Sequence, residues 1–160
     1  MLIILTMNIG IDLDYTLVYM KKNWYNNKNK LKIRKSAKKY LPMLAKQGFL
    51  FHIITGRKQK NVNKVYEIIK YVEHNIGIKF VSINFTNGNK KGYYAHINNC
   101  SYMIDDSLYY LMDCDQYGVN GIIYGKNIYN IENFNNISSA ISWKDISTFL
   151  LKKSITISLC

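Results

Sequence analysis

Apolar and polar positions divide the chain into short apolar segments separated by longer amphipathic ones. The apolar segments are rich in Ile, Val and Phe and are short enough to be buried strands. They span residues 3–12, 49–54, 79–84, 101–104 and 119–124.

Three of the stretches between and after these segments have helical periodicity, namely residues 36–47, 59–75 and 141–152. In 59–75 the apolar side chains return every three or four positions, which predicts one buried helix face. That face consists of Val62, Val65, Tyr66, Ile69 and Val72. Pro42 predicts either a kink or a shorter helix in 36–47, and Ser142 is a polar residue suited to the start of the last helix.

Strands that alternate with helices predict an α/β fold with a Rossmann-like, doubly wound parallel sheet. We find no internal repeat and no linker, and a length of 160 residues predicts a single domain over residues 1–160. In such sheets ligands bind beyond the carboxyl ends of the strands. The residues that follow each strand are therefore the place to look for chemistry.

The chain is strongly basic, with a formal net charge of +12. This charge favours an anionic partner such as nucleic acid or nucleotides. The alternative is compositional, because 19 Asn, 14 Tyr and a single Pro are typical of AT-rich coding, which also raises the Lys content. Composition leaves both interpretations open.

Neither a membrane protein nor an oxidised, secreted scaffold is indicated. No apolar run reaches the roughly 18 residues that a membrane span needs. The segment "MLIILTM" is too short for a signal peptide and lacks a basic start, and Met7 is an alternative start to Met1. Cys100, Cys114 and Cys160 form neither a metal pattern nor an even disulfide set, which predicts a reducing, cytoplasmic location.

Polar residues that can carry chemistry follow three of the predicted strands, and a Lys pair precedes the fourth strand. Four of the ten acids in the chain are among them. Each group alone has a plain structural explanation: a solvated turn, a loop, a wet surface or the acidic start of a helix. All of them in order along one chain favour a site, formed by Asp12, Asp14 and Thr16, then Thr55, Gly56 and Arg57, then Lys90 and Lys91, then Asp105, Asp106 and Ser107.

Four carboxylates that meet at one edge of a sheet would repel each other unless a cation lies between them. Mg²⁺ fits, because it prefers oxygen ligands and takes few protein carboxylates. These motifs contain no His or Cys, which argues against zinc. The sequence therefore predicts Mg²⁺ as the cofactor.

The sequences "DLDYT", "ITGR", "KKG" and "IDD" resemble the four motifs of the haloacid dehalogenase superfamily, in the order of that family, and the resemblance covers residues 8 to 125. It implies phosphoryl transfer through an aspartyl-phosphate. Asp12 would be the nucleophile and Asp14 the general acid and then the base. Thr55 would hydrogen-bond the phosphoryl oxygens, and Lys91 would neutralise their charge.

The same resemblance implies the metal ligands and the residues around the substrate. Asp105 would bind Mg²⁺ together with Asp12 and the carbonyl oxygen of Asp14, and Asp106 would help directly or through water. We assign the flanking residues to substrate binding, namely Thr16, Gly56, Arg57 and the more distant Trp24.

Two features narrow the type of reaction. The founding dehalogenases lack an aspartate at the position of Asp14 and need no metal, so its presence here favours a phosphatase. Tyr15 departs from the family, in which many members have Gly, although "DLDYTL" occurs in some phosphatase and nucleotidase branches. The chain resembles the deoxyribonucleotidase branch and the magnesium-dependent phosphatases.

A cap domain, which usually selects the substrate in this superfamily, has no room here. The segment of about residues 18–35 is long enough for a small flap but not for a folded cap. We therefore predict a capless enzyme with an open site that a second subunit could close. Between Lys21 and Lys39 there are nine basic residues and no acid. They could hold phosphates while Trp24 stacks on a base, or they could form a solvated loop.

The predicted function is that of a Mg²⁺-dependent phosphomonoesterase that acts on nucleotides or nucleic-acid end phosphates. One alternative is a phosphatase for phosphotyrosine in proteins. An alternative of another class is a nucleic-acid-binding protein on a degenerate phosphatase fold, against which the intact acids argue.

Overall fold

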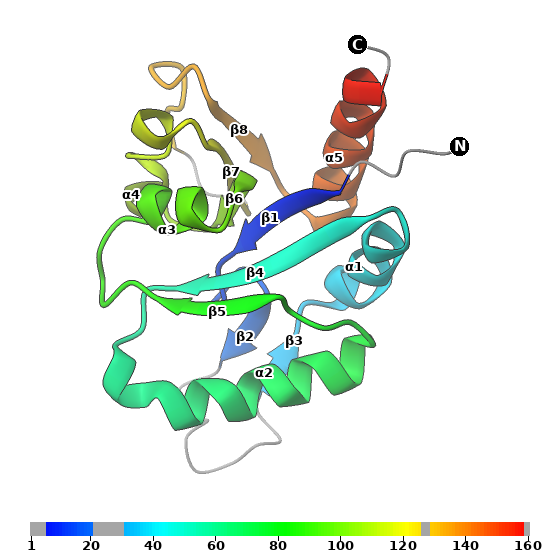
Figure 1. Cartoon of the computed structure of the whole chain (residues 1–160), viewed down its shortest axis with the longest axis vertical. Coiled ribbons are helices and arrows are strands. Elements are labelled where there is room, and N and C mark those ends of the chain that lie inside the picture. Colours follow the sequence, from blue (N-terminus) through cyan, green and yellow to red (C-terminus); the bar gives the residue numbers. More distant parts are fainter. Residues whose placement is uncertain (1–5, 21–30, 126–128, 159–160) are drawn as a thin grey trace.

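The computed structural model describes residues 6–20, 31–125 and 129–158 (Figure 1). Six strands form one sheet in the order β5-β4-β1-β6-β7-β8, and every neighbouring pair is parallel. The strands are β1 (Met7–Ile11), β4 (Phe49–Thr55), β5 (Ser82–Phe85), β6 (Cys100–Asp105), β7 (Asn120–Tyr124) and β8 (Ile137–Ala140). The predicted α/β architecture with a parallel sheet is confirmed.

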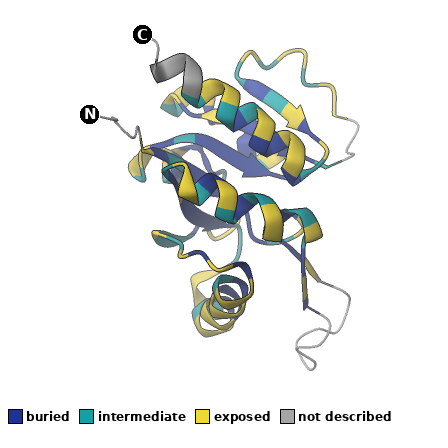
Figure 2. Ribbon diagram, turned by 90° about the vertical axis from the view of Figure 1, so that its right-hand side faces the viewer, coloured by how far each residue is buried: buried dark blue, intermediate teal, exposed yellow. Residues whose placement is uncertain are grey.

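Helices cover both faces of the sheet. The helices α1 (Lys35–Lys46), α2 (Val62–Ile76) and α5 (Trp143–Ser158) contribute to one buried apolar cluster, and α3 (Gly92–Ile97) and α4 (Leu108–Leu111) contribute to a second. Alternation along β1 separates the faces, because Ile9 and Ile11 belong to the first cluster while Gly10 faces Met103 of the second. Figure 2 shows that the helices turn their exposed sides away from the sheet.

A short antiparallel hairpin follows β1. It consists of β2 (Val18–Met20) and β3 (Leu31–Ile33), whose pairing joins Val18 to Ile33. Both of these side chains are buried in the first apolar cluster. The hairpin lies within the predicted flap of residues 18–35, while residues 21–30, including Trp24, lie outside the described residues.

The structure corrects three details of the predicted elements. The strand predicted at 79–84 begins only at Ser82, and Val81 is 56% exposed. On α2, Tyr66 is 45% exposed and Ile68 is buried in its place, because the helical period puts Ile68 on the same face as Val65 and Val72. The third detail concerns Pro42, which does not shorten α1, since the helix runs from Lys35 to Lys46; a kink at Pro42 stays a prediction.

The predicted last helix is confirmed together with its start. Ser142 Oγ accepts the backbone N–H of Asp145 at 3.2 Å, which caps the start of α5, and it donates to the Asp145 carboxylate at 2.7 Å. The strand β8 and the short helices α3 and α4 were not predicted. Each is four to six residues long, which is too short to show a period in the sequence.

The 3₁₀ turns η3 (Gln59–Asn61) and η4 (Asp115–Tyr117) complete the described elements. Within the described ranges, none of the helices combines the length and the apolar character that a membrane span requires.

Candidate active site

Three of the predicted site residues, Asp12, Thr55 and Asp105, lie at the carboxyl ends of neighbouring strands. The central strand β1 lies between β4 and β6, and Asp12 follows it directly. Thr55 is the last residue of β4 and Asp105 the last residue of β6. The Asp12 N–H donates to the carbonyl oxygen of Ile104 at 2.9 Å, which fixes Asp12 beside the end of β6.

Lys91 is fully buried between two of these carboxylates. Its Nζ lies 2.6 Å from Asp12 Oδ1 and 2.5 Å from Asp105 Oδ2. Burial by itself lowers the pKa of Lys91, but the charges of Asp12 and Asp105 outweigh it and raise that pKa above its ordinary value. The lysine is therefore charged and bridges the ends of β1 and β6.

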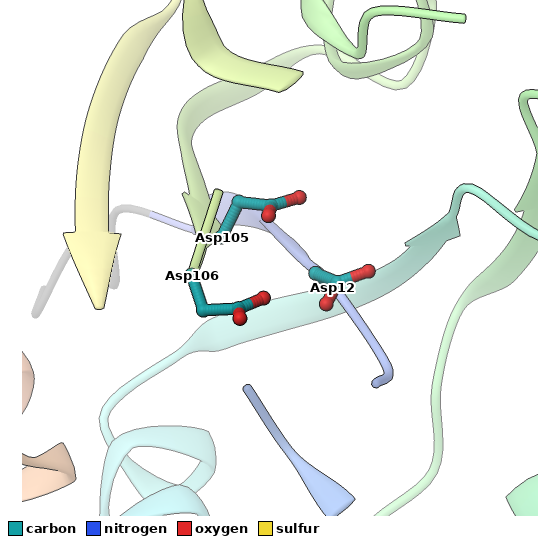
Figure 3. A group of neighbouring side chains, drawn as sticks. All are labelled: Asp12, Asp105 and Asp106. Atoms are coloured by element: carbon teal, nitrogen blue, oxygen red, sulfur yellow. The ribbon is translucent and has the colours of Figure 1, made fainter. Parts of the chain in front are cut away.

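Asp12, Asp105 and Asp106 form a cluster of carboxylates, each of which has an oxygen within 4.8 Å of the others (Figure 3). Burial, reinforced by the charge of Asp105, raises the pKa of Asp12 to about 7. Burial also raises the pKa of Asp106, with the charge of Asp12 as a second cause. In both residues the buried surroundings therefore disfavour the charged form of the carboxyl group.

This arrangement fits a divalent cation. Three carboxylates and the ammonium group of Lys91 leave two negative charges, which one divalent ion would neutralise. All the donors are carboxylate oxygens, the ligands that Mg²⁺ prefers. We infer that the residues present suit Mg²⁺ better than a softer metal.

Thr16 contacts this cluster through its hydroxyl group and is fully buried. Its hydroxyl lies 3.1 Å from Asp12 Oδ2 and 3.4 Å from Asp106 Oδ1, and it accepts the Asp106 N–H at 3.1 Å. The carbonyl oxygen of Thr16 accepts the indole N–H of Trp143 at 3.1 Å. Thr16 is placed to orient Asp12 and Asp106, whereas a direct contact with substrate stays a prediction.

Asp14 forms a bidentate ion pair with Arg57. Arg57 Nε lies 2.8 Å from Asp14 Oδ2, and Arg57 Nη2 lies 2.7 Å from Asp14 Oδ1. The sequence predicted both residues for the site but not this pairing. The pair holds the Asp14 carboxylate against the end of β4.

The backbone after β1 does not continue as the predicted strand to residue 12, because β1 ends at Ile11 and the chain turns. Leu13 is fully buried, and Tyr15 has a positive φ of 67°. The Arg34 side chain donates to the Tyr15 carbonyl oxygen, with Nε at 3.0 Å and Nη2 at 2.5 Å. The turn still places Asp12 and Asp14 in the wall of one pocket.

That pocket has a volume of about 330 Å³ and opens at the ends of the strands. Thr55 is buried behind it, where its Oγ1 accepts the Arg57 N–H at 3.3 Å. Trp24 lies outside the described residues. The pocket is lined by Asp12, Asp14, Tyr15, Gly56, Arg57, Asp106, Ser107 and Tyr110.

Tyr110 was missed by the sequence analysis. Its ring centroid lies 4.5 Å from Lys91 Nζ, and its hydroxyl group would be 2.7 Å from a Cβ at Gly56. Its carbonyl oxygen accepts the Lys91 N–H at 3.0 Å. One Tyr among 14 carries no sequence signal of this kind, because the contacts depend on how the chain folds back after β6.

A close contact with the backbone of Asp113 explains why the residue after Lys91 is a glycine, Gly92. A Cβ at this position would lie 2.8 Å from the backbone carbonyl carbon and oxygen of Asp113. The Gly92 N–H also donates to Asp113 Oδ1 at 2.9 Å. The close approach of the two backbones fixes the start of α3 and with it the direction of the Lys91 side chain.

Solved structures share this arrangement of strands and helices. D,D-heptose 1,7-bisphosphate phosphatase from B. bronchiseptica, complexed with magnesium and phosphate, matches with a TM-score of 0.69 at 11% identity, over 92% of this chain and 99% of that chain. A haloacid dehalogenase-like family hydrolase from Streptococcus pneumoniae matches with a TM-score of 0.62 at 10% identity, over 90% and 98%. The chain has the haloacid dehalogenase-like fold.

A third structure with this fold is 3-deoxy-D-manno-octulosonate 8-phosphate phosphatase from Moraxella catarrhalis, in complex with magnesium, phosphate and its sugar. It matches with a TM-score of 0.59 at 14% identity, over 92% of this chain and 86% of that chain. No protein-family model matches the chain, and no curated protein matches its sequence. The comparisons therefore support the fold that the four motifs imply, and they do so through structure rather than through sequence.

Proposed function

We propose that the protein is a Mg²⁺-dependent phosphomonoesterase that acts through an aspartyl-phosphate at Asp12. The observation that carries this proposal is the position of Asp12. Its carboxylate lies in the pocket wall, 2.6 Å from the buried ammonium group of Lys91 and within the carboxylate cluster of Asp105 and Asp106. The haloacid dehalogenase-like fold, shared with phosphatases, supports it.

The reaction follows as two displacements at phosphorus. An Asp12 oxygen forms a bond to phosphorus while the bond from phosphorus to the leaving oxygen breaks, and Asp14 gives a proton to that oxygen. Water then attacks the aspartyl-phosphate, Asp14 takes the proton from the water, and phosphate leaves with Asp12 regenerated. Asp14 lines the same pocket as Asp12, and it can carry this proton once its ion pair with Arg57 opens.

Charge is the main obstacle to the first displacement, since a carboxylate approaches a phosphate dianion. Lys91 offsets that repulsion at Asp12, and Arg57 offsets the charge of Asp14 in the same pocket wall. Asp12, Asp105 and Asp106 would hold Mg²⁺ together with the carbonyl oxygen of Asp14, and the bound ion would supply Lewis-acid stabilisation of the phosphoryl oxygens. Magnesium and phosphate are present together in two of the similar structures.

For the substrate we propose nucleotides or nucleic-acid ends. The net charge of +12 and the basic segment between Lys21 and Lys39 support an anionic substrate larger than inorganic phosphate. An open pocket admits such substrates, and a second subunit that closes it is part of the proposal. Sugar phosphates are the competing class, since two of the similar structures are named as phosphatases of sugar phosphates.

Hydrolysis of p-nitrophenyl phosphate tests the activity itself. We expect turnover with Mg²⁺, loss of turnover with EDTA, and a reduction by at least about 10³-fold in Asp12→Asn. Asp115→Asn is the matched control, because Asp115 is an exposed acid in η4, outside the pocket. Full activity of Asp12→Asn would contradict the mechanism, and oligonucleotide binding without any turnover would favour the nucleic-acid-binding alternative.

A substrate panel tests the specificity. It contains 5′- and 3′-nucleotides, 3′-phosphorylated oligonucleotides, phosphotyrosine peptides and sugar phosphates. The highest kcat/KM for one of the nucleotide substrates would support the proposal, and preference for phosphotyrosine or for sugar phosphates would replace it. If Lys28, Lys30 and Lys32 hold phosphates, their removal should also reduce the salt dependence of oligonucleotide binding.

A further inference from the structure

A second hollow, which we call the tyrosine groove, is formed by residues of α3, α4 and η4 and of the loop before α3. Figure 1 shows α3 and α4 next to each other on one face of the sheet. The volume of the groove is about 450 Å³, which is within the range of small-ligand sites. Among its lining residues, Lys90 is the one that the sequence analysis had placed in the predicted site. The groove is lined by Asn89, Lys90, Tyr93, Tyr94, Tyr109, Asp113 and Tyr117.

The tyrosine rings in the groove support one another and leave ring surface open to solvent. Tyr93 packs edge-on against Tyr94 at a centroid distance of 5.5 Å and against Tyr117 at 5.9 Å. Tyr93 is nevertheless 49% exposed and Tyr109 is 52% exposed. Large aromatic surface held in place at the protein surface is typical of a binding site rather than of a core.

Neighbouring side chains join the groove to the active site. Tyr109 contacts Tyr110 edge-on at a centroid distance of 5.2 Å, and Tyr110 lines the pocket that contains Asp12. Lys90 also lines the groove, and its neighbour Lys91 contacts Asp12. The groove and the active site are therefore formed by residues adjacent in the chain at two places, 90–91 and 109–110.

The groove carries charge of both signs beside its rings. Lys90 supplies a positive charge, and the acid among the lining residues, Asp113, accepts the Gly92 N–H with one carboxylate oxygen at 2.9 Å. Aromatic side chains beside a basic residue are the combination that binds single-stranded nucleic acid, because each base stacks on a ring while the backbone meets the positive charge.

We propose that the tyrosine groove binds the nucleobases next to the terminal phosphate of a single-stranded nucleic acid, with Tyr93 and Tyr109 as the stacking surfaces and Lys90 as a phosphate contact. This inference rests on the proposed function and gives its substrate class. It also assigns substrate selection to α3 and α4, on the opposite face of the sheet from α1, α2 and α5.

Binding and turnover of short oligonucleotides test the groove. The first measurement is the fluorescence anisotropy of a labelled, unphosphorylated oligothymidylate. The second is the ratio of kcat/KM for 3′- and 5′-phosphorylated forms of that oligonucleotide to kcat/KM for p-nitrophenyl phosphate. The variants are Tyr93→Ala and Tyr109→Ala, with Tyr93→Phe to retain the ring. Tyr66→Ala is the matched control, because Tyr66 is an exposed tyrosine on α2, away from the groove.

Each alanine variant should weaken oligonucleotide binding by roughly 5- to 150-fold, the range expected for the loss of one stacked base. The kcat/KM ratio should fall by a similar factor for the phosphorylated form that the enzyme accepts. Tyr93→Phe and Tyr66→Ala should both behave as the unsubstituted protein. Far-ultraviolet circular dichroism establishes that each variant is folded.

The results separate this inference from the proposed function. If the protein is a phosphatase but oligonucleotide binding is unchanged in both alanine variants, the proposed role of the groove is wrong and the proposed function still holds. If oligonucleotide binding depends on the tyrosines but no substrate is turned over, the proposed role of the groove holds and the proposed function is wrong. A larger loss for a phosphotyrosine peptide than for the oligonucleotide would overturn nucleic acid as the ligand of the groove.

Discussion

Substitution of Lys91 by Met tests whether the buried lysine holds the active site together. Methionine is similar in length and apolar, so the substitution removes the charge with little change in volume. It leaves Asp12 and Asp105, which Lys91 now joins at 2.6 and 2.5 Å, as neighbouring carboxylates without a counter-charge. The variant should therefore be much less stable than the unsubstituted protein.

The expected loss follows from the burial of all three groups, whose side chains are between 0% and 8% exposed. Removal of one partner from such a buried ion pair costs about 3–5 kcal/mol. This is a large part of the roughly 5–15 kcal/mol by which a domain is stable. The double substitution Lys91→Met with Asp105→Asn removes one of the stranded charges, so it should recover most of the loss.

Urea unfolding followed by tryptophan fluorescence measures the loss. Of the two tryptophans, Trp143 reports on this site, because it is fully buried and donates its indole N–H to the carbonyl oxygen of Thr16, which contacts Asp12. The single variant should unfold at lower urea with an unchanged slope. Added Mg²⁺ should stabilise it, because a divalent cation at the carboxylate cluster restores positive charge.

Two results would refute this reasoning. One is a loss of less than about 1 kcal/mol in Lys91→Met, which would mean that the carboxylates reach solvent or share a proton without cost. The other is a double variant that is no more stable than the single one, which would mean that the loss comes from packing rather than from stranded charge.

Three further predictions concern His52, two glycines and Tyr15. Burial lowers the pKa of His52 below 6.5, so the unfolded chain takes up the proton first and the free energy of unfolding should fall as the pH drops below about 6.5; urea titrations should show a shallower fall in His52→Asn, and equal falls would contradict this cause. Gly92→Ala should lower the Tm more than Gly56→Ala, because a Cβ at 92 meets backbone whereas a Cβ at 56 meets the end of a side chain that can move; equal losses would count against the backbone contact. Tyr15→Gly should be about 1 kcal/mol more stable to urea than Tyr15→Ala, because φ is positive there and alanine keeps the Cβ; a less stable glycine variant would show that the turn is not strained.

Much of the fold could be predicted because the strands of a parallel sheet are buried on both faces. Segments such as Phe49–Thr55 are therefore apolar throughout and stand out against the amphipathic helices. The short strand Ile137–Ala140 was missed because it lies at the edge of the sheet and has two serines in the middle. Tyr66 was assigned to the wrong face because a helical pattern alone does not fix the exact position of the buried side.

The pattern of strands was enough to predict that Asp12 and Asp105 meet, because the carboxyl ends of adjacent parallel strands lie at one edge of the sheet. Because β1 and β6 are neighbours, Asp12 and Asp105 lie at the same edge of the sheet independently of the contacts that their side chains make. Which charges pair is known only from the folded chain, as in Asp14 with Arg57, 43 residues apart, and so is the position of Tyr110 beside Lys91. Such partners depend on turns, register and the close approach of backbones, which a local pattern of apolar and polar residues does not encode.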